Sequence, residues 1–269
     1  MEHAAVLRNV VLWAAGDENV RAVVLEGSLA RDDGSVDDYS GLDIRLYVDE
    51  PELLLHSREW FEQFGDVLVV EALANPGWYP TRLVYYVDGK IDFLIAPTSS
   101  LANRERFGRR VRVLVDKDRL TATIAQGDAA APSLPDEESY LICVHEFYAA
   151  ALMYARMLVR GEPIKAKFRD WDMKTRLFAM IEWDHIARFG RDRNVQPLGA
   201  HFREWADADV LDQLDCCWSA GLAPSRDALS STVSLFTMAS ERVAREVALP
   251  EFDAAAVIGE IERIATARS

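Results

Sequence analysis

The sequence predicts an α+β protein whose N-terminal part forms a mixed sheet and whose C-terminal part forms a helical bundle. Short apolar runs that alternate with polar residues, as strands do, are concentrated in the N-terminal part. From Glu137 onward, apolar residues recur with the spacing of one helix face. Residues 126–135 are rich in small and polar residues and proline, which indicates a boundary. We therefore expect one domain over residues 1–130 and a second over residues 136–269.

The elements of the N-terminal part follow from local patterns. Helical spacing of apolar residues predicts a helix over residues 3–15, and residues 23–26 form a short apolar strand. Residues 42–48 alternate as a second strand. A helix is expected over residues 51–64, because proline suits the first turn of a helix, and another strand over residues 67–71.

A β-hairpin is the strongest local signal. Residues 83–87 and 91–95 are alternating runs, and Asp88-Gly89 lies between them. Asp-Gly accepts the positive φ angles of a tight turn. The C-terminal part is then predicted to be helical over residues 140–160, 172–189, 209–220, 228–247 and 254–268.

Composition limits the class of protein. The chain has 269 residues, of which 50% are hydrophobic, so it can bury a sizeable core. Its formal charge is −14, and the sequence has no stripe of basic residues. A nucleic-acid binder needs such a stripe to replace phosphate counterions, so we expect no nucleic-acid partner. The negative charge suits either an ordinary acidic protein or a cleft for a polycationic small molecule.

Signals for membrane insertion, secretion and disulfides are weak. No apolar run reaches about 18 residues, the length of a membrane span, and the N-terminus has no basic region before an apolar core. The three cysteines, Cys143, Cys216 and Cys217, lack the spacing of zinc ligands. We expect a cytoplasmic protein with no membrane partner and no disulfides.

Three motifs in the predicted sheet carry chemistry. Gly27-Ser28 ends a strand, where glycine lets a phosphate approach the backbone and serine adds a hydroxyl donor. Asp43 and Asp92 each interrupt an apolar strand, which is costly unless the carboxylate is paired, hydrogen-bonded or bound to metal. Alone, each motif is common in turns and at strand ends. Together, in this order and spacing, they favour a phosphate site with Mg²⁺, which prefers oxygen ligands.

These motifs resemble those of the aminoglycoside 6-adenylyltransferases (streptomycin adenylyltransferases), which are polymerase β-like nucleotidyltransferases. The family shows a strand with Gly-Ser, Asp-x-Asp-Ile, Trp-x-x-x-Phe-Gly and Gly-x-x-Ile-Asp-x-x-x-x-Pro. The residues that carry the resemblance are 21–28, 38–44, 60–65 and 88–97. A weaker similarity occurs at residues 143–147 and 176–183.

The resemblance implies a nucleotidyltransferase domain followed by a helical substrate-binding domain. The implied reaction is Mg²⁺-dependent transfer of AMP from ATP to a hydroxyl of an aminoglycoside-like molecule, which modifies an antibiotic. Gly27 and Ser28 would hold the nucleotide, and Asp43 and Asp92 would bind the metal and act in catalysis. The first Asp of the family's Asp-x-Asp falls on Gly41, which cannot coordinate metal. We therefore expect slow or absent turnover.

Candidate residues of the helical part are less specific. Glu146 is a candidate general base, as is Glu182, each on an otherwise apolar or aromatic helix. Lys165 and Lys167 follow Pro163 and could grip the triphosphate. For each, a solvated helix or turn residue is the alternative.

Two other functions stay open from the sequence. The first is a catalytically inactive homologue that binds nucleotide or a cationic ligand. The second is a nucleotidyltransferase for another small acceptor, such as a lincosamide or a biosynthetic intermediate.

Overall fold

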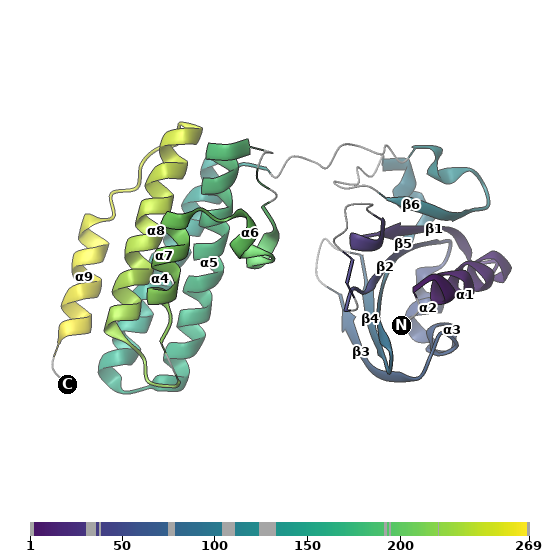
Figure 1. The fold of residues 1–269 in the computed structure, drawn as a ribbon, viewed down its shortest axis with the longest axis horizontal. Coiled ribbons are helices and arrows are strands. Elements are labelled where there is room, and N and C mark those ends of the chain that lie inside the picture. Colours follow the sequence, from purple (N-terminus) through teal and green to yellow (C-terminus); the bar gives the residue numbers. More distant parts are fainter. Residues whose placement is uncertain are drawn as a thin grey trace. The chain divides into compact units, whose positions relative to one another are not determined.

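The chain divides into two compact units, Met1–Ala131 (the sheet unit) and Pro132–Ser269 (the helical unit), which are coloured purple to teal and teal to yellow in Figure 1. Each unit is described by itself. This computed structural model describes residues 3–30, 36–37, 39–74, 79–103, 111–123, 133–190, 193, 195–219 and 221–267.

The sheet unit is built on a six-stranded mixed sheet with the strand order β3-β4-β5-β2-β1-β6. Strands β2 and β5 are parallel, and the other neighbours are antiparallel. This is the mixed sheet that the alternating apolar runs predict. The strands are β1 (Val20–Glu26), β2 (Leu42–Val48), β3 (Val67–Leu73), β4 (Thr81–Tyr86), β5 (Gly89–Pro97) and β6 (Arg112–Asp116).

Three helices cover one face of this sheet: α1 (His3–Gly16), α2 (Pro51–His56) and α3 (Glu59–Glu62). Their apolar side chains form one core with the residues that alternate along the central strands, including Ile44 and Phe93. The indole ring of Trp60 meets the ring of Phe93 edge to face, with centroids 4.9 Å apart. Residues between these core positions on β1, β2 and β5 therefore project from the other face of the sheet.

One local prediction in the sheet unit was wrong, and one strand was missed. The single helix expected over residues 51–64 is two helices, because the backbone is extended at Ser57, which ends α2. Strand β6 was not predicted, since it is only 5 residues long and its apolar pattern is short. It lies at the edge of the sheet, antiparallel to β1.

The helical unit is a bundle, as predicted. The rings of Phe147 and Phe236 stack in its core with centroids 3.6 Å apart. Helix α5 begins at Pro163, earlier than the predicted start at residue 172. Lys165 and Lys167 are therefore helical residues. The helices are α4 (Glu137–Arg160), α5 (Pro163–Phe189), α6 (Phe202–Trp205), α7 (Ala208–Leu214), α8 (Arg226–Val247) and α9 (Ala255–Thr266).

Helix α4 is the one described helix that is long and apolar enough to cross a membrane by length and composition alone. In the most apolar 18-residue segment of this helix, 50% is buried within the structure. This burial is typical of the core helix of a bundle. All three cysteines are free, as expected.

A buried histidine joins two elements of the helical unit. The side chain of His185 on α5 is fully buried, and its Nδ1 lies 2.8 Å from the carbonyl oxygen of Ile181. Its Nε2 accepts a hydrogen bond of 3.0 Å from the backbone N–H of Asp207, which caps α7. Because Nε2 accepts, the ring is neutral with its proton on Nδ1. Burial lowers the pKa of His185 from its ordinary 6.5.

Candidate functional site

Three acidic residues form one row across neighbouring strands. Glu26 on β1 pairs with Asp43 on β2, and Asp43 pairs with Asp92 on β5. Residues in register on adjacent strands project to the same face, and the strands lie about 4.8 Å apart. The side chains flanking Asp43 belong to the helix-covered core, so the row lies on the opposite face. The structure thus brings Asp43 and Asp92 side by side.

Gly27 makes room for the Asp43 carboxylate. The chain turns at Gly27 with a φ of +70°, a conformation that glycine adopts without steric cost. A Cβ at this position would lie 1.8 Å from Oδ2 of Asp43, far inside any nonbonded contact. Ser28 follows directly and begins a short 3₁₀ turn, Ser28–Ala30. The Gly-Ser turn and the Asp43 carboxylate therefore touch, as a combined phosphate and metal site requires.

Basic residues neutralise part of this acidic row. Nε of Arg45 lies 2.5 Å from Oε1 of Glu26, so this carboxylate is bound within the sheet. Nζ of Lys90 donates to Oδ2 of Asp92 at 2.9 Å. Burial lowers the pKa of Lys90, but the hydrogen bond and the charge of Asp92 outweigh it, so the net shift is upward. Lys90 is thus a charged partner of Asp92.

One oxygen of the row has no hydrogen-bond partner among the described residues. Oδ1 of Asp92 is buried and accepts no hydrogen bond in the part of the chain that the structure describes. A buried carboxylate oxygen without a partner is costly, and a bound cation would satisfy it. The orphaned oxygen therefore supports Asp92 as a cation ligand.

Position 41 offers space but no ligand. A Cβ built on Gly41 would lie 3.4 Å from the carbonyl oxygen of Lys90, an ordinary contact, so a side chain could be accommodated there. Asp37 in the preceding loop makes local hydrogen bonds. Its Oδ1 accepts hydrogen bonds from the N–H of Tyr39 at 3.0 Å and from the hydroxyl of Ser40 at 2.9 Å. Asp38 lies outside the described residues.

Mg²⁺ is the metal that the motifs imply, and the donors on this face fit one such ion. Mg²⁺ in phosphate-binding sites is held by one or two carboxylates together with phosphate oxygens and water. Asp43 and Asp92 supply the two carboxylates, and the orphaned Oδ1 is one free donor. The described residues contain no cluster of three or more His, Cys, Asp or Glu that could hold a metal.

The remaining predicted residues lie in the helical unit. Glu146 on α4 pairs with Arg176, whose Nη2 is 2.7 Å from Oε2, and lines a groove of 530 Å³ with the exposed Trp171. Lys165 pairs with Glu162 at 2.5 Å, and Lys167 donates to the hydroxyl of Ser219 at 2.8 Å. These contacts all lie within the helical unit.

Glu182 has a structural partner instead. Its Oε1 accepts the backbone N–H of Leu198 at 2.7 Å, and burial raises its pKa. Glu146, by contrast, lines the groove that contains the exposed ring of Trp171.

Sequence reasoning missed Glu26, Arg45 and Lys90. One signal was available for Lys90, because it precedes Asp92 by two positions and so shares its face of the strand. Glu26 and Arg45 are separated by a loop, so only the strand register shows that they pair.

A Gly-Ser turn beside two carboxylates on adjacent strands of a mixed sheet, in a chain with a helical second unit, defines the class of polymerase β-like nucleotidyltransferases. The model of the streptomycin adenylyltransferase family matches residues 1–257. The chain therefore belongs to this family, and the predicted fold class and resemblance are confirmed.

Two relatives and one solved structure are similar to this chain. The aminoglycoside 6-adenylyltransferase of Staphylococcus aureus is 27% identical over 192 residues, which cover 66% of this chain and 67% of that protein. Its counterpart in Campylobacter jejuni is 23% identical over 192 residues, covering 65% of this chain and 64% of that protein. The chain thus matches about two thirds of the length of these relatives. A crystal structure of an aminoglycoside 6-adenyltransferase from Bacillus subtilis has a TM-score of 0.47 and 18% identity, and the match covers 97% of this chain and 98% of that one.

Proposed function

We propose that this chain transfers AMP from ATP to a hydroxyl of an aminoglycoside-like small molecule, with Mg²⁺ bound at Asp43 and Asp92. The observation that carries the proposal is the direct pairing of these two aspartates on parallel strands beside the Gly27 turn. The family and the names of its relatives support the aminoglycoside acceptor. Modification of this kind would confer antibiotic resistance, and the use of ATP suits a cytoplasmic enzyme.

The residues of the sheet unit divide the work by their positions. The turn at Gly27 and Ser28 offers a backbone approach and a hydroxyl to the triphosphate. Asp43 and Asp92 would hold the metal, which would neutralise phosphate charge and favour ionisation of the acceptor hydroxyl. The acceptor oxygen then bonds to the α-phosphorus of ATP, and the bond from this phosphorus to the pyrophosphate oxygen breaks.

The helical unit would supply the acceptor side and the base. Glu146 lines a groove with Trp171, an exposed ring suited to stacking against a sugar, and would take the proton of the acceptor hydroxyl. Its ion pair with Arg176 is half exposed, so an incoming cationic acceptor can compete for the carboxylate. Lys165 and Lys167 would stabilise the phosphates.

A second candidate function is nucleotide binding without turnover. Gly41 removes a carboxylate that the family's motif provides, which favours slow turnover or none. A different small acceptor, such as a lincosamide, is the remaining alternative within the same chemistry.

A transfer assay tests the proposal. The purified chain is incubated with ATP, Mg²⁺ and a panel of aminoglycosides that includes streptomycin, and pyrophosphate release and the mass of each acceptor are measured. We expect one acceptor to gain the mass of AMP. Asp43→Asn and Asp92→Asn should each abolish this transfer while circular dichroism shows an unchanged fold. Asp118→Asn is the matched control, since Asp118 lies beyond β6 and pairs with Arg21.

Two results would contradict the proposal. Unchanged turnover in Asp43→Asn would remove this residue from the metal site. Nucleotide binding without pyrophosphate release, for every acceptor tested, would favour the binding function.

A further inference from the structure

Lys90 lies beside Asp92 and beside the space next to Gly41. Its Nζ is 2.9 Å from Oδ2 of Asp92. A Cβ at Gly41 would also lie 3.8 Å from Cβ and 3.9 Å from Cδ of Lys90. The lysine side chain therefore runs beside the space of residue 41 and ends on the Asp92 carboxylate.

The lysine is held in this position by its surroundings. Tyr85 on β4 is the register partner of Lys90, and the ammonium lies 5.4 Å from the centroid of its ring. An ammonium at this distance from an aromatic ring is attracted by the π-electrons. Lys90 thus has two partners, an aromatic ring and a carboxylate, and its side chain is 32% exposed. The exposed part leaves ammonium protons available for a phosphate oxygen.

The charges of this face explain what the lysine does. Glu26 pairs with Arg45, and Asp92 pairs with Lys90, so two carboxylates of the row already face a cation of the protein. A second divalent cation at Asp92 would meet the ammonium of Lys90, and like charges at such a distance repel each other.

We propose that Lys90 is a built-in cation that takes the place of a second metal ion, so that this chain binds a single divalent cation with its nucleotide. The inference rests on the proposed function and refines its metal site. Lys90 neutralises Oδ2 of Asp92, and the buried Oδ1, which has no described partner, is left for the one metal shared with Asp43. The ammonium of Lys90 is a point charge that its strand holds in position, whereas a metal ion would have to bind from solution.

Counting bound Mn²⁺ tests the proposal without relying on activity. Mn²⁺ is titrated into the protein with α,β-methylene-ATP, which cannot lose pyrophosphate, and bound ions are counted by electron paramagnetic resonance. We expect one Mn²⁺ per wild-type chain, and two in the Gly41→Asp/Lys90→Met double variant. Lys90→Met alone should bind its first Mn²⁺ at least ~10-fold more tightly, because a nearby positive charge is gone.

Three further variants control the experiment. Lys90→Arg keeps the charge and should still bind one Mn²⁺. Lys117→Met removes a lysine that donates to the carbonyl oxygen of Asp17, away from the acidic row, and should match the wild type. Lys90→Gln replaces Lys90→Met if the latter does not fold.

The outcomes separate this inference from the proposed function. Two Mn²⁺ ions on the wild-type chain would refute the role of Lys90 and leave the transferase proposal standing. Equal Mn²⁺ affinity in the wild type and the neutral Lys90 variant would refute it as well. If no variant binds Mn²⁺ with the nucleotide analogue, the proposed metal site itself is wrong, and this inference is wrong with it.

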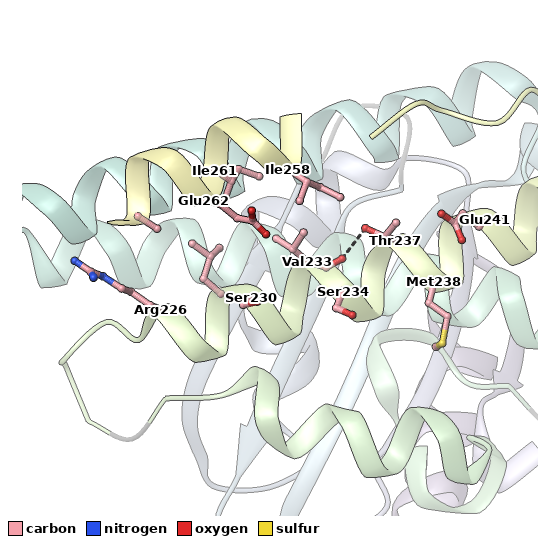
Figure 2. A pocket seen from close by; sticks show the side chains of 12 residues that line it. Arg226, Ser230, Val233, Ser234, Thr237, Met238, Glu241, Ile258, Ile261 and Glu262 are labelled. Carbon is pink, nitrogen blue, oxygen red and sulfur yellow. Dashed lines mark hydrogen bonds between the residues drawn. The ribbon is translucent and has the colours of Figure 1, made fainter. Parts of the chain in front are cut away.

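The helical unit also contains a groove of 520 Å³ between α8 and α9 (Figure 2). It is lined by apolar side chains such as Val233 and Ile261, with Glu241 and Glu262 among the polar groups, and nothing in the structure shows what would cover it.

Discussion

Replacing Gly27 by alanine should disturb both the backbone turn and the Asp43 side chain of the site. Two effects act together in this variant. Residue 27 keeps a φ of +70°, which is unfavourable for alanine, and its Cβ would lie 1.8 Å from Oδ2 and 2.8 Å from Cγ of Asp43. Since the strand pairing of β1 and β2 fixes both backbones, the Asp43 side chain must move away.

The size of the effect follows from separating these two terms. A left-handed backbone costs a non-glycine residue about 1–2 kcal/mol. Forcing a packed side chain to shift adds about 1–3 kcal/mol. Together, these terms predict that Gly27→Ala destabilises the sheet unit by about 2–5 kcal/mol. Displacing a proposed metal ligand should also weaken Mg²⁺-dependent nucleotide binding ~10–100-fold.

Gly161 offers a matched control for the backbone term. Its φ is +65°, almost the same as that of Gly27, yet an added Cβ would have nothing within 4 Å. Gly161→Ala should therefore destabilise the helical unit by about 1–2 kcal/mol and leave nucleotide binding unchanged. Urea unfolding gives the stabilities, and calorimetric titration of Mg²⁺ and α,β-methylene-ATP gives the affinities. Wild-type nucleotide affinity in a folded Gly27→Ala variant would refute the steric argument.

Two further predictions concern turnover and pH. Gly41→Asp can be accommodated sterically, but its carboxylate would pair with Lys90. Alone, this variant should change the rate of AMP transfer by less than about threefold, whereas Gly41→Asp/Lys90→Met should raise that rate at least ~10-fold. Equal rates of AMP transfer in the two variants would contradict this. Folding lowers the pKa of His185, so as the pH drops below 6.5 this residue gains a proton in the unfolded chain before it does in the folded one. The free energy of unfolding should therefore fall by up to about 1.4 kcal/mol per pH unit in this range. Urea unfolding at pH 7.5, 6.5 and 5.5 measures this loss, and His185→Gln should show a smaller one.

Periodicity predicted most of the fold because burial on one side imposes it. The strands containing Ile44 and Phe93 alternate since one face meets the helices, and the long helices have a repeat of apolar positions since they share a core. Strand β6 lacked this signal because an edge strand has one neighbour and few buried residues. The start of α5 was misplaced because its first turns carry charged side chains that pack little, although proline at residue 163 is a helix-start signal.

The site was only partly predictable from the sequence. Gly27, Ser28, Asp43 and Asp92 stand out because polar residues and glycine interrupt apolar strands there. The partners of these residues do not stand out in the sequence. Lysine is common on protein surfaces, and only the strand register shows that Lys90 lies beside position 41. Pairwise contacts across strands depend on which residues face each other, and the sequence contains no local signal for this.

The register that forms the site is the same register that forms the core. Leu42 and Ile44 are fully buried against the helices, and Asp43 between them projects from the other face. A slip of one residue between β2 and its neighbours would turn Asp43 into the apolar core and expose both flanking side chains. An ionised carboxylate in that core would cost several kcal/mol, and the two exposed side chains would lose about 1.5–3 kcal/mol each. The apolar residues next to Asp43 therefore hold its carboxylate beside Asp92 and Gly27, and substitutions such as Ile44→Ala should loosen the metal site as well as the fold.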